Sequence, residues 1–325
     1  MKEIEEILKT IPRLDDGETA VVATVIDVQG SAYRGAGAKM LIRANGDAVG
    51  TVSGGCLEAD VLERAKRVVD SGAAQVFVYD TTKHEDSVFS LNMGCRGVIR
   101  ILFEPFDRDY FDRISTANKE RRRFVSSVSI APDSIGLRDY DETGTVQIDR
   151  SQLIGERFVE IIDPPISILI FGGGTDAIPV CTIAKTLGWR VSIVDHRPAF
   201  ATRERFPDAD SIQLLAPENF AGNLKVDANS VAVVMTHNYE KDKLIQKFIL
   251  PSNAAYIGAL GPKKRTEKLL AEIGESWPAN LYGPIGLDIG SESPEEIALA
   301  IVAEIQSVLK KRSAGFLRDR NAGIH

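Results

Sequence analysis

The pattern that most restricts the fold of this chain is a glycine-rich loop between an apolar strand and a helix. Residues 166–171 (ISILIF) have the length and composition of a strand, and the loop Gly172-Gly173-Gly174-Thr175-Asp176-Ala177 follows at once. A helical pattern comes next, and a second strand then ends in Asp195, at the spacing of the dinucleotide-binding fingerprint. This order predicts a Rossmann-type half in which Gly172, Gly174 and Asp195 are candidate binding residues.

The sequence of the loop alone does not identify its ligand. A Rossmann scaffold can bind a dinucleotide, or its loop can meet some other phosphate, because a fold does not decide function. Asp176 would place a negative charge near a pyrophosphate, which disfavours the dinucleotide.

The rest of this half alternates strands with helices, which predicts a doubly wound parallel sheet. Ligands in such sheets bind outside the carboxyl ends of the strands, where three polar loops are expected. The candidates from these loops are His237, Gly286 and Asp288. His237 is either a ligand or acid–base group, or a loop residue that only makes hydrogen bonds. We expect strands at 211–214, 231–235 and 254–257 and helices at 239–249, 262–273 and 294–310.

In the first half, a glycine-rich stretch leads to a cysteine at the start of a helix. Gly54 and Gly55 predict a bend with unpaired backbone amides, and a helical pattern runs from Leu57 to a stop at Gly72. Unpaired amides and the helix dipole would favour an anion there and lower the pKa of Cys56. The pattern fits a nucleophilic or metal-binding Cys56, and it fits a cysteine that only packs in the interior equally well.

A second cysteine, Cys95, lies before Arg96 and a strand expected at 98–103. If that strand lies beside the strand ahead of Cys56, expected at 48–52, the two thiols could face one pocket. This is a hypothesis, because one sequence does not reveal the pairing. The other elements expected in this half are an N-terminal helix, a helix at 106–121, strands at 20–28, 39–43, 74–79, 124–130 and 156–162, and turns at 131–152.

Asp163-Pro164-Pro165 is the best linker candidate, because two prolines disfavour helix and interrupt a sheet ladder. We therefore expect an α/β chain with an N-terminal α/β domain at 1–163, a Rossmann-like domain at 166–311 and a polar tail at 312–325. The cleft between the two domains is the expected ligand site.

Composition excludes several classes of protein. A formal net charge of -7 over 325 residues provides no basic surface for nucleic acid. There is no apolar run long enough to span a membrane and no signal peptide, so no membrane association is expected. Three cysteines predict a reducing, cytoplasmic location rather than a disulfide scaffold, and four scattered histidines do not indicate a structural zinc site.

The two halves together resemble the XdhC/CoxI family of accessory proteins, which mature xanthine dehydrogenase and related molybdenum hydroxylases. In the first half the resemblance rests on GSAYRGAGAKMLI, GTVSGGCLEADV and MGCRGVI. In the second it rests on ILIFGGGTDAIP, VDHRP, MTHNYEKD, YIGALGPKKR and PIGLDIGSESPEEIA. The most specific of these motifs are GGCLEADV and PIGLDIG with SPEEIA.

This resemblance implies a cytoplasmic, non-catalytic maturation factor. Such a factor would bind molybdenum cofactor, protect it, assist its sulfuration and insert it into an apo molybdenum hydroxylase, with a cysteine desulfurase as a further partner. The resemblance also implies that Cys56 and Cys95 contact the cofactor and its molybdenum, and that Glu58 orients Cys56 or takes a proton. Arg96 replaces the usual glycine of the family, which either adds phosphate affinity or indicates that Cys95 lacks the family role. Tyr33 replaces a common proline.

Two other functions compete with this hypothesis. The first is an NAD(P)-dependent oxidoreductase that uses Asp195 for the ribose, although no catalytic base or hydride site stands out in the sequence. The second is a protein-binding scaffold in which neither thiol matters. Assembly into a homo-oligomer is compatible with the sequence, which indicates no interface.

Overall fold

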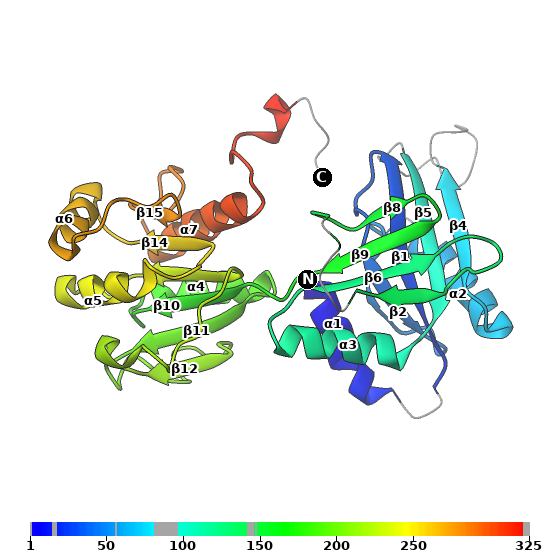
Figure 1. Ribbon diagram of the computed structural model, residues 1–325, viewed down its shortest axis with the longest axis horizontal. Helices are drawn as coiled ribbons and strands as arrows, with labels where there is room; N and C mark the ends of the chain where they lie inside the picture. Colours follow the sequence, from blue (N-terminus) through cyan, green and yellow to red (C-terminus); the bar gives the residue numbers. More distant parts are fainter. Residues whose placement is uncertain are drawn as a thin grey trace. The chain divides into compact units, whose positions relative to one another are not determined.

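The computed structural model describes residues 2–14, 18–55, 57–80, 97–141, 146 and 148–320. Its internal contacts divide the chain into two units, and the division falls between Pro164 and Pro165 (Figure 1).

An antiparallel five-stranded sheet forms the centre of the first unit, in the order β3-β2-β1-β5-β4. As predicted, β2 and β3 form a hairpin around Asn45-Gly46. Long β1 pairs with β2 on one side and with β5 on the other, where Gly30 faces Gly97. The strands are β1 (Ala20–Gly30), β2 (Lys39–Arg43), β3 (Ala48–Gly50), β4 (Gln75–Asp80) and β5 (Gly97–Pro105).

This order corrects the pairing considered for the two cysteine segments. Strand β3 leads toward Cys56 and strand β5 follows Cys95, but β2 and β1 lie between them. The two strands are therefore not neighbours. Cys56 and Cys95 themselves lie outside the described residues.

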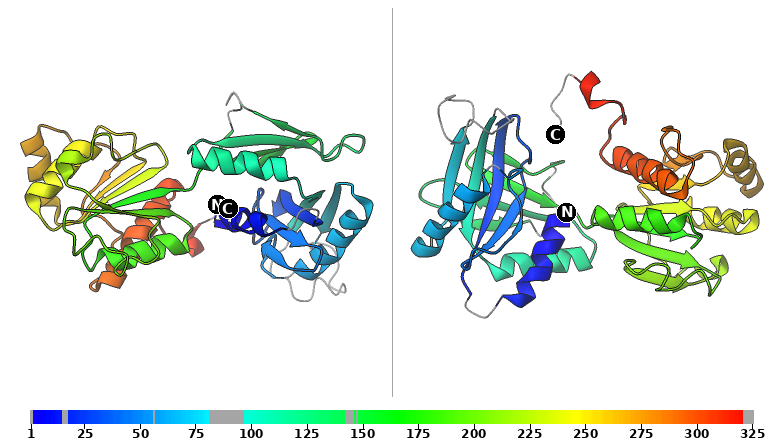
Figure 2. Two further views of the ribbon diagram at one scale, coloured as in Figure 1. Left: turned by 90° about the horizontal axis from the view of Figure 1, so that it is seen from below. Right: turned by 180° about the vertical axis from the view of Figure 1, so that it is seen from behind.

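Different elements pack against the two faces of this sheet. Helix α2 (Glu58–Ser71) covers one face with Val61, Ala65 and Val68. It ends where predicted, at a left-handed Gly72. The other face packs against α1 (Lys2–Thr10), α3 (Arg108–Lys119) and a second antiparallel sheet (Figure 2).

The second sheet has the order β7-β6-β9-β8. Strand β7 lies in the segment 131–152, which was predicted to be rich in turns. The strand was not predicted, because three residues are too few to show an alternating pattern. The four strands are β6 (Phe124–Ser129), β7 (Arg138–Tyr140), β8 (Gln152–Ile154) and β9 (Arg157–Ile162), and a short 3-10 helix (Ile11–Arg13) follows α1.

A buried ion pair joins the two sheets of this unit. Lys39 on β2 and Glu160 on β9 are each 1% exposed, and Lys39 Nζ lies 2.8 Å from Glu160 Oε1. Tyr110 of α3 donates a hydrogen bond to Glu160, and Arg138 of β7 pairs with Glu104 of β5 at 2.6 Å. Burial acts to raise the pKa of Glu160, but Lys39 and Arg138 outweigh it and hold that pKa below its usual value.

The second unit is built on a six-stranded parallel sheet, in the order β12-β11-β10-β13-β14-β15. This confirms the predicted Rossmann-like doubly wound domain. Two-residue β15 was not predicted, since two residues carry no periodic signal. The strands are β10 (Ser167–Phe171), β11 (Arg190–Asp195), β12 (Ser211–Leu214), β13 (Ser230–Val234), β14 (Tyr256–Ala259) and β15 (Leu281–Tyr282).

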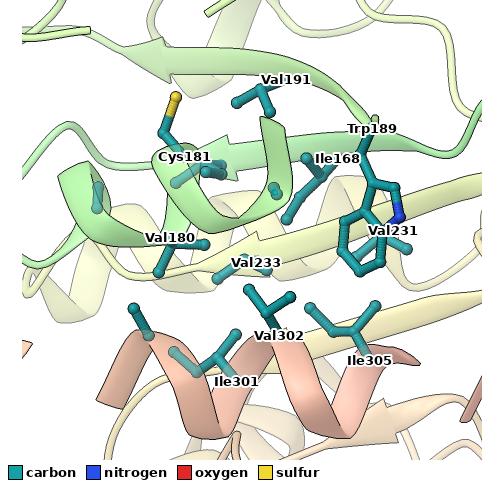
Figure 3. Packing of buried hydrophobic residues seen from close by; sticks show 14 of the residues in the cluster. Ile168, Val180, Cys181, Trp189, Val191, Val231, Val233, Ile301, Val302 and Ile305 are labelled. Atoms are coloured by element: carbon teal, nitrogen blue, oxygen red, sulfur yellow. The ribbon is translucent and has the colours of Figure 1, made fainter. Parts of the chain in front are cut away.

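Helices cover both faces of the parallel sheet. On one face, residues of α4 and α7 pack against alternate residues of β10, β11 and β13 (Figure 3). On the other, residues of α5 and α6 do the same. The helices are α4 (Ala177–Thr186), α5 (Tyr239–Ile249), α6 (Lys263–Ile273) and α7 (Pro294–Leu309), with 3-10 turns at Pro217–Asn219 and Leu317–Asp319. Within the described ranges, no helix combines the length and apolar character needed to cross a bilayer.

Replacing Lys39 with methionine should selectively destabilise the first unit. Glu160 would stay buried without its closest cation, which typically costs about 3 kcal/mol in the free energy of unfolding. Both tryptophans, Trp189 and Trp277, belong to the second unit, so their fluorescence reports its unfolding, whereas circular dichroism reports both units. We expect urea unfolding followed by circular dichroism to shift while the tryptophan transition stays in place.

The matched control is Lys66→Met, because Lys66 is 68% exposed in its pair with Glu63. It should change the free energy of unfolding by less than about 0.5 kcal/mol. Equal shifts for the two variants would contradict the role assigned to the buried pair.

Candidate functional site

The loop that leads to Cys56 is organised around the carboxylate of Glu58. Oε1 accepts hydrogen bonds from Thr51 Oγ1 at 2.5 Å and from the Ser53 amide at 3.1 Å. Oε2 accepts from Ser53 Oγ and from the Leu57 amide, the latter at 3.2 Å. The side chain at the start of α2 thus binds both ends of the turn that contains Gly54 and Gly55. We call residues 51–58 the thiol loop.

These contacts define what Glu58 can do. Partial burial acts to raise its pKa, but the hydrogen bonds from Ser53 and Thr51 prevail and lower it. A carboxylate with a lowered pKa and several donors is a poor proton acceptor. Of the two roles implied by the family resemblance, the geometry therefore favours orientation of the loop over proton transfer.

The bend itself differs from the sequence prediction in one respect. The amides of the Gly54-Gly55 bend were expected to be unpaired, but the Gly55 amide donates to Ser53 Oγ at 3.3 Å. The Leu57 amide donates to the same oxygen at 3.0 Å. For Gly55 the prediction failed because it did not foresee that the hydroxyl of the residue directly before the bend would accept from it. Gly55 is nevertheless accessible: it has a φ of 106°, and a Cβ built on it would meet nothing within 4 Å. A ligand can therefore approach the backbone beside Cys56.

A neighbouring turn touches the described residues next to both cysteine segments. The ring of Tyr33 lies against Gly54, where an added Cβ would come within 3.0 Å of it. At the start of β5, a Cβ on Gly97 would come within 2.7 Å of the Ser31 carbonyl. The turn around Ser31 and Tyr33 therefore adjoins both glycines. Cys56, Cys95 and Arg96 lie outside the described residues, so their roles stay predictions.

In the second unit, the glycine loop after β10 is tightly enclosed. Gly172 has a φ of 109°, and a Cβ there would lie 2.6 Å from the Met235 carbonyl oxygen. A Cβ on Gly173 would lie 2.4 Å from the carbonyl oxygen of Phe200. Both positions therefore require glycine for backbone packing. Gly174 is partly exposed and adjoins the side chain of Asp176.

Asp195 stabilises the glycine loop by a hydrogen bond to its backbone. It is buried at the end of β11 and accepts hydrogen bonds from the Gly173 amide at 2.8 Å and from Arg197. Burial acts to raise its pKa, but these donors outweigh burial and lower it. Both carboxylate oxygens are thus engaged within the protein, whereas binding a ribose would require at least one to be available.

The start of α4 has few amides for a pyrophosphate. The Ala177 amide donates to the Gly174 carbonyl and the Ile178 amide to the Thr175 carbonyl. The next residue, Pro179, has no N–H. The carboxylate of Asp176 makes no capping hydrogen bond to α4 and instead lies 2.7 Å from His237 Nε2. A negative charge therefore stands where a dinucleotide would place its phosphates.

His237 follows β13 at the same edge of the sheet and is held in a rare backbone conformation, with a φ of 58°. Its side chain is 63% exposed and directed to Asp176. Gly286 and Asp288 belong to the loop after β15, three strands away from β10. The Gly286 amide donates to Glu304 Oε1 at 3.1 Å, and Asp288 is exposed.

The predicted site residues that the structure describes thus fall into two groups. One lies in the thiol loop of the first unit, and the other lies in the second unit, at the edge of the parallel sheet where the strands have their carboxyl ends. Sequence reasoning missed Thr51, Ser53 and Tyr33 as parts of the thiol loop and its surroundings. Only the serine carried a signal, because it stands where a side chain can accept from the bend amides. Among the described residues, no group of three or more histidine, cysteine, aspartate or glutamate side chains could hold a metal ion.

Comparison with known proteins identifies the family. Residues 13–80 match the XdhC and CoxI family, and residues 168–305 match the XdhC Rossmann domain. A protein of Bacillus subtilis (strain 168), whose name describes a probable component of xanthine dehydrogenase, is 33% identical over 318 residues, which cover 92% of this chain and 96% of that protein. The chain belongs to the XdhC and CoxI family. This confirms the resemblance predicted from the motifs.

Two further proteins are similar over nearly the whole chain. A crystal structure described as a xanthine dehydrogenase from Bacillus halodurans superposes with a TM-score of 0.86 at 32% identity and covers 98% of both chains. The molybdenum cofactor insertion chaperone PaoD of Escherichia coli (strain K12) is 23% identical over 308 residues, which cover 92% of this chain and 86% of PaoD. The thiol loop lies in the segment that matches the XdhC and CoxI family.

Replacing Glu58 with glutamine should loosen the thiol loop. The amide keeps one acceptor oxygen but loses the charge, and hydrogen bonds to charged groups contribute about 1.5–3 kcal/mol. We expect amide hydrogen exchange at Ser53 and Leu57 to become about tenfold faster. Glu63→Gln on the exposed side of the same helix is the control. Unchanged exchange in Glu58→Gln would contradict the organising role of Glu58.

Replacing Asp195 with asparagine should destabilise the second unit in a pH-dependent way. The native pKa of Asp195 lies below its ordinary value of 3.8, so its contribution is present above that pH and is lost as the pH falls through the native pKa. At pH 6 we expect a loss of about 2 kcal/mol in the free energy of unfolding, measured by tryptophan fluorescence. At pH 3 the difference from wild type should shrink. Exposed Asp208→Asn is the control, and a pH-independent difference would contradict this account.

Proposed function

We propose that this XdhC-family chain is a maturation factor that binds molybdenum cofactor and inserts it into a molybdenum hydroxylase of the xanthine dehydrogenase type. The names of two relatives support this proposal, since one refers to xanthine dehydrogenase and the other to a molybdenum cofactor insertion chaperone. The structural observation that carries it is the thiol loop, which Glu58 holds in one shape while the backbone at Gly55 stays open to a ligand.

The residues of the thiol loop are suited to bind the molybdenum of such a cofactor. A cysteine thiolate is a soft ligand, and Gly55 directly before Cys56 leaves space for a bulky group to approach. When bound, the cofactor would supply the molybdenum centre that the receiving enzyme needs. We assign Cys56 and Cys95 to the metal and Glu58 to positioning. The Gly55 and Leu57 amides already donate to Ser53 Oγ, so we assign the phosphate to Arg96.

The finer parts of the proposal come from the family resemblance. The chain would hold and protect the cofactor while a cysteine desulfurase supplies the terminal sulfur, and the protein works in the cytoplasm. In the second unit, Gly172, Gly174 and Asp195 shape the glycine loop, and His237, Gly286 and Asp288 stay predicted binding residues of that unit.

An NAD(P)-dependent oxidoreductase receives less support from the same residues. Asp195 is bonded to Arg197 and to the glycine loop, and Asp176 adds a negative charge at the start of α4. A dinucleotide would have to displace the hydrogen bonds to Asp195 and to bind its phosphates beside the negative charge of Asp176. Titration with NADH measures this directly, and saturable binding with turnover would favour the enzyme.

The proposed function can be tested by cofactor retention. Anaerobically purified protein is mixed with freshly released molybdenum cofactor and passed through a sizing column, and metal and pterin are counted in the protein peak. We expect near-stoichiometric retention by wild type and a drop of about tenfold or more in Cys56→Ala, which corresponds to about 1.4 kcal/mol. Cys181→Ala is the matched control, because buried Cys181 packs between α4 and the sheet, where burial raises the pKa of its thiol to about 11 (Figure 3).

Each result has a defined meaning. No retention by wild type would contradict the proposal and would make the second unit the part to test. Full retention by the Cys56→Ala, Cys95→Ala double variant, together with normal maturation of a molybdenum hydroxylase, would indicate a protein scaffold in which neither thiol matters.

A further inference from the structure

We propose that the ring of Tyr33 is a stacking platform for the pterin ring of the bound cofactor. The inference rests on the proposed function, because it assigns the organic part of the same ligand to a second place beside the thiol loop.

Tyr33 is exposed although the turn that carries it is firmly attached. The tyrosine is 63% exposed, whereas its neighbour Ala32 is only 9% exposed within the core beneath α2. On the other side, Arg34 forms an ion pair with Glu3 of α1. A large aromatic ring held at the surface by anchored neighbours is pre-organised to meet a partner, since little freedom is lost on binding.

The ring also lies next to the thiol loop. A Cβ built on Gly54 would be 3.0 Å from Cγ of Tyr33 and 3.2 and 3.3 Å from its two Cδ atoms. The inner part of the ring therefore lies close to the Gly54 backbone, and a Cβ on Gly54 would require the ring to shift by a few tenths of an ångström. Most of the ring stays accessible to a ligand.

The chain length between Gly54 and the thiol restricts where the cofactor can lie. Cys56 is two residues beyond Gly54, and two residues span at most about 7 Å. Molybdenum cofactor carries its metal-binding dithiolene and its pterin on one fused ring system. A metal held at Cys56 therefore keeps the pterin near the Tyr33 turn.

The chemistry of the two rings is complementary. A pterin presents a flat, polar heterocycle, and flat heterocycles stack on tyrosine faces in many nucleic-acid sites with limited dependence on their substituents. Stacking adds affinity without a covalent or ionic contact. It would therefore hold the pterin in the same way whether or not the metal is present.

Binding of metal-free molybdopterin distinguishes stacking on Tyr33 from metal binding at Cys56. Binding of molybdopterin and of the complete cofactor is measured by anaerobic equilibrium dialysis for wild type, Tyr33→Leu, Tyr33→Phe and Cys56→Ala. We expect Tyr33→Leu to weaken both ligands about tenfold, because it removes one ring contact common to both. Tyr33→Phe should stay within about twofold of wild type, since stacking needs the ring and not the hydroxyl. Cys56→Ala should weaken the complete cofactor far more than the metal-free form.

A matched control tests whether any exposed ring would have the same effect. Phe316 is 69% exposed in the second unit, and Phe316→Leu should bind both ligands like wild type. Circular dichroism of Tyr33→Leu should match that of wild type, because the side chain contributes little to the core.

The outcomes distinguish the stacking from the function on which it rests. If wild type binds neither ligand, the proposed function itself is wrong. If wild type binds and Tyr33→Leu binds equally well, cofactor binding stands and the stacking platform is overturned. Equal binding combined with slower insertion into an apo molybdenum hydroxylase would assign Tyr33 to protein docking and would also overturn it.

Discussion

In both units, a carboxylate accepts hydrogen bonds from the amides of a glycine-rich loop and so gives that loop one shape. Glu58 binds the two ends of the thiol loop, and Asp195 binds the amide of Gly173. Glycine-rich segments are otherwise the most costly to order, because glycine loses more conformational freedom than other residues. Charge-assisted hydrogen bonds offset this cost, and donors outweigh burial in lowering the pKa of each carboxylate.

The same interaction limits what each loop can bind. Amides that donate to an internal acceptor are not available to an external anion, so the loops are less suited to phosphate than their glycine content suggests. In the first unit this leaves the thiol of Cys56 and the open backbone at Gly55 as the distinctive features. In the second unit it leaves a sheet edge whose Asp176 and His237 pair with each other. The Rossmann fold is therefore present without the contacts that usually hold a dinucleotide.

The thiol loop depends in turn on the scaffold of the first unit. The Lys39–Glu160 pair joins the two sheets, and Glu3 of α1 accepts from Arg34 and from the Lys39 amide. The Tyr33 turn is thus connected to the same part of the scaffold as the buried pair. Removing one charge from such a pair leaves the other unpaired in a medium of low polarity, which strongly destabilises the fold.

Much of this protein could be predicted from local patterns. The order of strands and helices, the hairpin at Asn45-Gly46, the helix stop at Gly72 and the Rossmann-type half depend on residues close in sequence, whose periodicity and turn chemistry act locally. The short strands β7 and β15 escaped prediction because so few residues carry no period. The motifs around Cys56 and Asp288 also sufficed to recognise the family.

Only the tertiary structure decided which groups meet. The separation of β3 from β5 by two strands, the hydrogen bond from the Gly173 amide to Asp195 and the contact of Tyr33 with Gly54 all depend on how segments distant in the sequence pack. No local propensity encodes such pairings, because the free energy that selects them comes from burial and hydrogen bonding between elements. The sequence by itself determined the kinds of elements and the family, and packing determined which of their polar groups are left for a ligand.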